Sequence, residues 1–180
     1  MAGYVIHLAV AEEYLRKHNN QEDHGEFIRG VLYPDLAEDK SLSHYGSSSS
    51  KVNLVRFLQE NKLDNSFNRG VFLHLYTDYL FYNRYLDTFS PEIYNDYDLM
   101  NKELMNKYNV KLPEEIKSGV GFKTGNDYKI LTLDLATRFI DEISEHSIEE
   151  IEKSIRRRPE KWLKYKKEKR DWRRTEVDII

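Results

Sequence analysis

The stretch FLHLYTDYLFY, residues 72–82, places two ionisable side chains in an otherwise aromatic and aliphatic run. His74 and Asp78 are four positions apart, about one α-helical turn, so both project from one face of a helix. The longer run from Phe67 to about Asp87 repeats apolar side chains in steps of four and three residues, and both ionisable residues fall inside this stripe. We therefore predict a central helix that is packed on most sides. Its imidazole and carboxylate can contact the same neighbouring group.

Helical spacing and capping residues predict further helices on both sides of this run. They cover residues 3–18, 26–33, 52–61, 90–110 and 131–144, and a last one starts at a capping box that begins with Ser147. Because no strand pattern and no long repeat is recognisable, the predicted fold class is all-α, a compact multi-helix domain.

Two irregular segments interrupt these helices. Pro34 is expected to end or redirect the helix before it, which leaves Asp35 at a turn. Residues 36–51, with four consecutive serines, form the longest irregular segment and carry His44. Residues 110–128, with three glycines, form the second. The way both segments fold decides the shape of any pocket.

The composition favours a single compact globular body. The 180 residues are 39% apolar, 33% charged and 13% aromatic, and the net charge of −3 gives no argument for binding nucleic acid or membrane through overall charge. The sequence contains no cysteine, so any transition-metal site must be built from histidine, aspartate and glutamate.

The first 17 residues do not resemble a targeting segment. They lack a basic region at the start, and their apolar stretch breaks at Glu12 after a few residues, which predicts neither a signal peptide nor a membrane span. The expected location is cytoplasmic.

The charge is distributed unevenly along the chain. Between Lys153 and Arg174 there are twelve lysines or arginines and three acidic residues, and the sequence interleaves Trp162, Tyr165 and Trp172 with them. This pattern is compatible with binding to nucleic acid or to an anionic membrane, or with a solvated terminal helix whose aromatic side packs back on an acidic body. We divide the chain into a helical metal-binding domain, residues 1–150, and a basic, aromatic helical extension, residues 151–180.

Five polar residues depart from the pattern of a simple helical core: His7, Asp35, His44, His74 and Asp78. Each has an ordinary structural explanation, and His74 with Asp78 could be a buried hydrogen-bonded pair. Burying both nevertheless costs several kcal/mol unless each is paired, and a divalent cation satisfies both at once. Asp35 and His44 are the donors available from the loops to complete a site that suits zinc, manganese or iron.

The same residues carry a resemblance to a known family. An early histidine in the first helix, then PDL, SHY and HLYTD, resembles the superfamily of zinc-dependent phospholipases C and single-strand nucleases, all-helical phosphodiesterases. The similarity is greatest to its small uncharacterised bacterial members, described as zinc-dependent phospholipase C-like. It spans residues 4 to about 86, and FLHLYTDYLFY and SHYG are its most specific parts.

The resemblance implies a role for each of the five residues. Asp35, His44, His74 and Asp78 match ligands of one zinc ion, and His7 matches a ligand of a second ion for which Asp78 would be the bridging carboxylate. Asp35 also matches the position of a general base toward an attacking water. Two neighbouring metal ions would stabilise the attacking and leaving oxygens of a phosphoester displacement.

The chain departs from the family pattern in three places. It begins Met1, Ala2, Gly3 where the secreted enzymes begin with a metal-binding tryptophan, and Arg84 occupies the position of a further zinc-binding histidine. His146 and Glu150 have the spacing of the remaining ligands but lie beside the capping box at Ser147. We therefore expect an incomplete ligand set that binds one or two ions.

Three functions remain open on the sequence alone. The first is a divalent-metal-dependent hydrolase acting on a small phosphoester. The second is a phosphohydrolase of the HD type, which would require adjacent His and Asp, and this dipeptide does not occur. The third is a non-catalytic module that binds through residues 153–174. The oligomeric state is left open.

Overall fold

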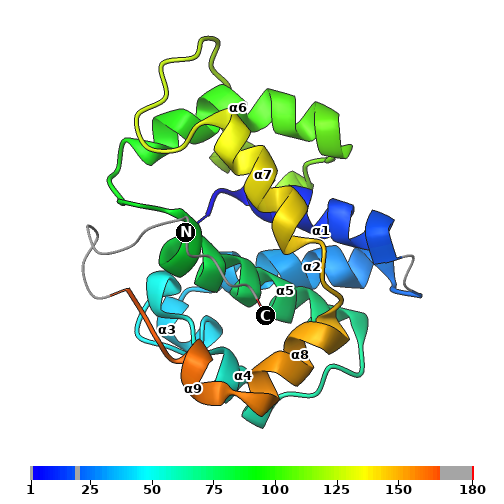
Figure 1. Cartoon of the computed structure of the whole chain (residues 1–180). Helices are drawn as coiled ribbons and strands as arrows, with labels where there is room; N and C mark the ends of the chain where they lie inside the picture. Colours follow the sequence, from blue (N-terminus) through cyan, green and yellow to red (C-terminus); the bar gives the residue numbers. More distant parts are fainter. Residues whose placement is uncertain (1, 19–20, 167–179) are drawn as a thin grey trace.

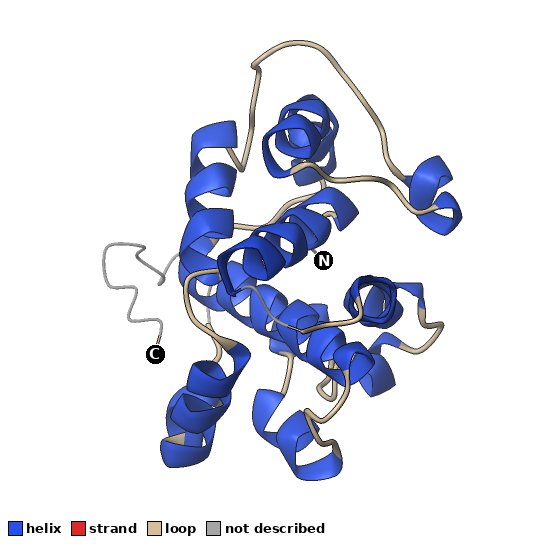
Figure 2. Cartoon of the chain, turned by 90° about the vertical axis from the view of Figure 1, so that its right-hand side faces the viewer, coloured by secondary structure: helices blue, strands red, loops and turns tan. Residues whose placement is uncertain are grey.

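A computed structural model describes residues 2–18, 21–166 and 180, and the regular structure in these ranges is helical throughout (Figure 2). The α-helices are α1 (Tyr4–His18), α2 (His24–Leu36), α3 (Lys40–Ser43), α4 (Leu54–Glu60), α5 (Ser66–Leu80), α6 (Ile93–Tyr108), α7 (Leu133–Ile143), α8 (Ile148–Arg157) and α9 (Pro159–Trp162). Short 3₁₀ segments are η1 (Ser49–Lys51) and η3 (Glu114–Gly119), and η2 (Phe81–Tyr85) is a π-helical turn. The predicted all-α class is confirmed for the described part of the chain.

Helix α5 is the centre of the fold, with α1 and α2 packed beside it (Figure 1). Helices α6 and α7 lie on one side of this group, and α3, α4, α8 and α9 lie on the other. Every residue of α5 from Gly70 to Leu80 is buried, including His74 and Asp78. The predicted central helix, packed on most sides, is thus present. Its N-cap is Asn65, whose side-chain oxygen accepts the backbone N–H of Asn68.

Pro34 lies inside α2, which corrects the expectation that Asp35 is at a turn. The helix continues to Leu36 and closes with a hydrogen bond from the backbone N–H of Ala37 to the carbonyl of Tyr33. A proline in the last turn removes one backbone hydrogen bond, and tertiary packing tolerates that loss because the helix ends two residues later. Asp35 is thus a helical residue with a buried side chain.

The predicted long helix after Phe67 changes its winding after Leu80, two residues beyond Asp78. Residues Phe81–Tyr85 form the π-helical turn, which the sequence pattern did not predict. The side chain of Asn83, buried in this turn, donates to the carbonyl of Tyr79 and accepts the backbone N–H of Lys166. The turn therefore joins the end of α5 to the C-terminal segment.

One predicted helix start differs slightly from the structure, and another agrees with it. Ser90 and Pro91 form a turn before α6 rather than its cap and first residue, because the first bonds of this helix are i→i+3 bonds such as Ile93 N–H to Ser90 carbonyl. The capping box at Ser147 is present as predicted: Ser147 and Glu150 each accept a backbone N–H from the other residue.

The described part of the basic C-terminal segment packs Trp162 and Tyr165 against the fold. The side chain of Trp162 is 1% exposed, with ring centroid distances of 5.4 Å to Tyr79 and 5.9 Å to Tyr76 on α5. The hydroxyl of Tyr165 donates to the carbonyl of Val52. The expected domain boundary between residues 150 and 151 falls inside α8. Trp172 and the rest of the basic run after residue 166 lie outside the described residues.

Among the described residues, each helix is either too short or too polar to cross a membrane.

Candidate metal centre

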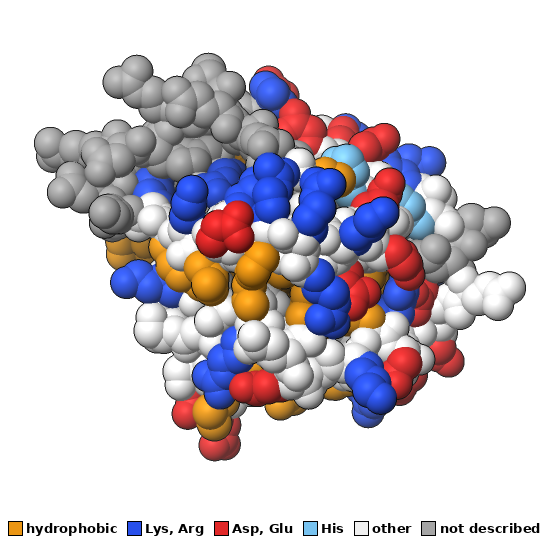
Figure 3. All heavy atoms as spheres, turned by 60° about the horizontal axis from the view of Figure 1, so that its bottom comes forward, with side chains coloured by type: hydrophobic (Ala, Val, Ile, Leu, Met, Phe, Trp, Pro, Cys, Tyr) orange, Lys and Arg blue, Asp and Glu red, His pale blue; other side chains and the backbone are white. Residues whose placement is uncertain are grey.

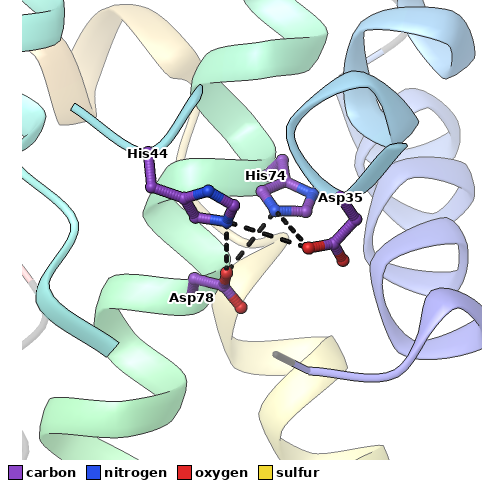
Figure 4. A group of neighbouring side chains, drawn as sticks. All are labelled: Asp35, His44, His74 and Asp78. Atoms are coloured by element: carbon purple, nitrogen blue, oxygen red, sulfur yellow. Dashed lines mark ion pairs between the residues drawn. The ribbon is translucent and has the colours of Figure 1, made fainter. Parts of the chain in front are cut away.

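The structure brings all five sequence-predicted residues to one place. Asp35 comes from the last turn of α2, His44 ends α3, His74 and Asp78 lie one turn apart on α5, and His7 comes from α1 (Figure 4 draws four of the five). Each of the five residues is at most 6% exposed, and Asp35 is the most exposed of them. Segments separated by about 70 residues thus converge on a buried polar cluster in an apolar core.

Four atoms of the cluster face one another at the spacing of metal ligands. Asp78 Oδ2 lies 3.3 Å from His44 Nε2 and 3.4 Å from His74 Nε2. Asp35 Oδ1 lies 3.8 and 3.9 Å from the same two nitrogens. Ligands about 2.0–2.2 Å from a tetrahedral metal ion are about 3.3–3.6 Å apart, whereas a direct N–H···O bond is about 2.7–3.2 Å long. The spacing thus fits a shared cation better than direct hydrogen bonds.

The backbone decides which ring nitrogen of each histidine faces the centre. His44 Nδ1 lies 3.0 Å from the carbonyl oxygen of Lys40, and His74 Nδ1 lies 2.7 Å from that of Val31. A carbonyl oxygen only accepts hydrogen bonds, so both Nδ1 atoms carry a proton. In a neutral imidazole the other nitrogen, Nε2, then has a free lone pair, which here points at the carboxylates. This arrangement is typical of metal-binding histidines.

His7 occupies the opposite side of the two carboxylates. Its Nε2 lies 3.3 Å from Asp78 Oδ1 and 3.9 Å from Asp35 Oδ2, the oxygens that do not face His44 and His74. Its ring stacks on that of His74, with centroids 3.8 Å apart and an angle of 9° between planes. The two carboxylates therefore each present one oxygen to His44 and His74 and the other to His7.

Most of the polar side-chain atoms of the cluster lack hydrogen-bond partners. In the described part of the chain, ten buried side-chain nitrogen or oxygen atoms have no partner, and seven of them belong to the five residues of this centre. They comprise both ring nitrogens of His7, both oxygens of Asp35, Nε2 of His44 and of His74, and Oδ2 of Asp78. Because an unpaired buried polar group costs about 1–3 kcal/mol, such a concentration calls for a ligand that meets all of them.

The electrostatics of the centre favour a cation. Burial opposes the charge of Asp78, but the nearby imidazoles of His7, His44 and His74 hold its pKa well below the usual range. Burial and the neighbouring His74 lower the pKa of His7. Burial also disfavours a charged His74, but Asp35 and Asp78 outweigh it and raise its pKa. The carboxylates therefore favour positive charge beside them, and a metal ion would supply such a charge.

The weaker sequence match, His146 with Glu150, and the departure from the family pattern at Arg84 both lie elsewhere. His146 Nδ1 and Glu150 Oε2 are 3.9 Å apart in a partly exposed pair at the start of α8. The guanidinium of Arg84 lies over the ring of Tyr79, 5.6 Å from its centroid. Neither belongs to the group of residues that the structure assembles as a possible metal site, namely Asp35, His44, His74 and Asp78.

Sequence reasoning missed the groups that orient the ligands. The carbonyls of Val31 and Lys40 belong to the backbone, so the residue types at these positions give no indication that they orient a ligand. Ser43 could have been identified from the sequence, because a residue with a hydroxyl group directly precedes His44 in SHY. Its hydroxyl lies 3.0 Å from His44 Nδ1.

Comparisons of the chain with protein-family models, with curated proteins and with solved structures found no match.

Proposed function

We propose that this protein is a divalent-metal-dependent hydrolase that acts on phosphoesters. The observation that carries the proposal is the set of orphaned buried ligand atoms of His7, Asp35, His44, His74 and Asp78, which face one another at ligand spacing. The donor set of imidazole and carboxylate suits zinc, and also manganese or iron. Asp35, His44, His74 and Asp78 would hold one ion, and His7 with the opposite carboxylate oxygens would hold a second.

The arrangement of the carboxylates is compatible with a two-metal hydrolytic site of the kind that cleaves phosphoesters. Both Asp35 and Asp78 offer one oxygen to each side of the centre, which is how two ions are held about 3.5–4 Å apart. Such a pair supplies Lewis-acid polarisation of a phosphoryl group and a lowered pKa for a bound water. The resemblance of HLYTD and SHY to the zinc-dependent phospholipase C and single-strand nuclease superfamily supports the same reaction class.

Asp35 is the residue we propose as general base. Its oxygens lie farther from the histidine nitrogens than those of Asp78 do, at 3.8–3.9 Å against 3.3–3.4 Å, and it is the most exposed member of the cluster. Asp78 is fixed from a second direction, because its Oδ1 accepts the backbone N–H of Ala2. Asp35 is thus the carboxylate better placed to take a proton from an attacking water.

The decisive experiment measures metal content and hydrolysis in parallel. Protein purified without a histidine tag is analysed by elemental mass spectrometry and assayed with bis(p-nitrophenyl) phosphate and p-nitrophenyl phosphate. We expect bound divalent metal in the wild type, little in His74→Ala and Asp78→Ala, and metal-dependent hydrolysis that Asp35→Asn lowers by about 10²–10⁴-fold. His146→Ala, a histidine outside the cluster, is the matched control and should leave both readouts unchanged.

Two outcomes would contradict the proposal. A well-folded wild type that neither retains metal nor binds it on titration would reject the centre, and the cluster would then be a buried hydrogen-bonded network. A protein that binds metal but hydrolyses neither ester would reject the enzyme and leave a structural metal site.

A second candidate function is a binding module, favoured by one observation. The side chains of Lys153, Arg157, Arg158 and Lys164 are exposed and form no ion pair with another described residue; we name these four the basic face. Basic side chains gather on the side of the molecule that Figure 3 brings forward. Phosphate groups of a nucleic acid or of an anionic membrane would fit such a surface. Bases cannot stack on Trp162, because its ring is buried.

Removing the whole extension would not test this second function cleanly, because α8 and Trp162 belong to the core. The better variant replaces the basic face with four glutamines, and its matched control replaces the exposed residues Lys102, Lys111, Lys117 and Lys129. Salt-sensitive binding to duplex DNA or to phosphatidylserine vesicles that only the first variant loses would support the module. Equal binding by both variants would reject it.

A further inference from the structure

Helix α3 caps the end of α2 with two side chains. The last carbonyls of a helix have no partner within the helix, and those of Pro34 and Asp35 belong to the last turn of α2. The hydroxyl of Ser43 donates to the carbonyl of Pro34 at 2.9 Å, and the ammonium group of Lys40 donates to the carbonyl of Asp35. The backbone beside the Asp35 carboxylate is thereby attached to α3.

The same two residues also hold the ring of His44. Ser43 has a single hydroxyl proton, which goes to the carbonyl of Pro34, so its oxygen faces His44 Nδ1 at 3.0 Å as an acceptor. The carbonyl of Lys40 is the second acceptor, also at 3.0 Å from Nδ1. A continuous chain of hydrogen bonds therefore runs from His44 Nδ1 through Ser43 to the last turn of α2, which carries Asp35.

We propose that Ser43 is a positioning residue that keeps His44 in the Nδ1–H tautomer and fixes its Nε2 against Asp35, with Lys40 as the second attachment. This inference rests on the proposed metal centre, since it concerns how two of its ligands are oriented. Ser43 is 4% exposed and touches the ligand His44 rather than the centre itself. Replacing a group that hydrogen-bonds to a metal-binding histidine typically lowers metal affinity about 10–100-fold.

An ordinary helix cap would act differently from a positioning residue. Loss of a cap lowers the stability of the protein but does not change the orientation of a distant ring. The matched control is therefore Thr132→Ala, which removes the N-cap hydroxyl of α7 on a different helix from any of the five residues. If Ser43 acted only as a helix cap, Ser43→Ala would give the same result as Thr132→Ala.

The first measurement is the affinity of metal-stripped protein for Zn²⁺, titrated in competition with a chromophoric chelator. We expect Ser43→Ala and Lys40→Met to lower the affinity about 10–100-fold. Ser43→Thr, which keeps the hydroxyl, should restore affinity toward the wild-type value, and Thr132→Ala should lower the melting temperature without changing affinity. Wild-type affinity in folded Ser43→Ala, shown to be folded by circular dichroism, would overturn the inference.

The second measurement needs no metal. Long-range ¹H–¹⁵N spectra of the metal-free protein distinguish the two imidazole tautomers. We expect His44 as a single Nδ1–H species in the wild type and a smaller share of this tautomer in Ser43→Ala, where the carbonyl of Lys40 is the one acceptor left of the two. If the wild type binds no Zn²⁺ but Ser43→Ala still disturbs the tautomer, the proposed function fails while the positioning role stands. An Nε2–H tautomer of His44 in the wild type would reject the positioning role.

Discussion

Gly30 on α2 and Gly70 on α5 face one another's helix at the point where the two helices cross. A Cβ atom on Gly30 would overlap the carbonyl oxygen of Phe67, and one on Gly70 would overlap that of Phe27. The backbones can approach this closely only because both residues lack a side chain. The bond from His74 Nδ1 to the carbonyl of Val31 crosses the same contact, so the close approach sets the separation of the ligands that α2 and α5 carry.

Gly70→Ala should destabilise the protein by about 3 kcal/mol, because the added methyl group meets backbone atoms that cannot rotate away. It should also lower metal affinity, since α2 must move away from His74. Urea unfolding followed by circular dichroism gives the first quantity. The control is Gly25→Ala in the first turn of α2, where the nearest atom would be 3.5 Å away and alanine should be neutral or stabilising by up to about 1 kcal/mol. Equal stability of the two variants would contradict the close contact.

Asp96→Asn should destabilise the protein by about 2 kcal/mol without changing metal binding. The carboxylate of Asp96 is fully buried in α6 and accepts the backbone N–H groups of Lys129, Ile130 and Leu131 at 2.7–2.9 Å. An amide replaces one acceptor by a donor and leaves a buried N–H unpaired. Asp127→Asn, at a side chain 83% exposed, should be nearly silent. A loss of bound metal in Asp96→Asn would contradict this prediction and show that α6 affects the metal centre.

Trp162→Ala should destabilise the whole protein by about 3–5 kcal/mol, because it opens a cavity beside Tyr76 and Tyr79. The unfolding curve should remain a single transition at lower denaturant. Leu163→Ala, at the neighbouring and 44% exposed position, should change stability by less than about 0.5 kcal/mol. If Trp162→Ala left the main transition in place, residues 151–180 would be an independent unit.

His7→Ala should reduce the bound metal from two equivalents to one, because it removes the single histidine on its side of the two carboxylates. Elemental analysis of the reloaded protein measures the ratio. Chelator treatment should lower the melting temperature of the wild type, because metal that binds only the folded state stabilises it by mass action. The shift should be smaller in His7→Ala and close to zero in His74→Ala. One equivalent in both wild type and His7→Ala would mean that His7 is only a stacking partner of His74.

Local sequence signals were sufficient for most helices and for the rigid part of the centre. Asn65 and Ser147 cap helices as their sequence context predicts, and His74 with Asp78 needed only helical periodicity. These features depend on residues within one or two turns of each other. The π-helical turn after Leu80 could not be predicted, because nothing in the local pattern distinguishes it from a continuing α-helix.

The remaining ligands depended on tertiary structure. Pro34 predicted a turn at Asp35, but packing of α2 on α5 carried the helix past the proline. His44 lies in a segment that reads as irregular and exposed, yet it is fully buried because α3 folds back onto α2. The sequence therefore identified the candidate ligands. Their convergence at one centre follows from the packing of α2 on α5 and from the cap that α3 forms on α2.

The bond from the Ala2 backbone to Asp78 has a practical consequence for how the protein should be produced. Because Ala2 is fully buried against a proposed ligand, an affinity tag fused directly before it would start next to the centre. A polyhistidine tag at that position would add imidazoles where metal is to be counted, and could bind the same ions. Purification through a removable tag placed after Ile180 keeps the metal measurement independent of the tag.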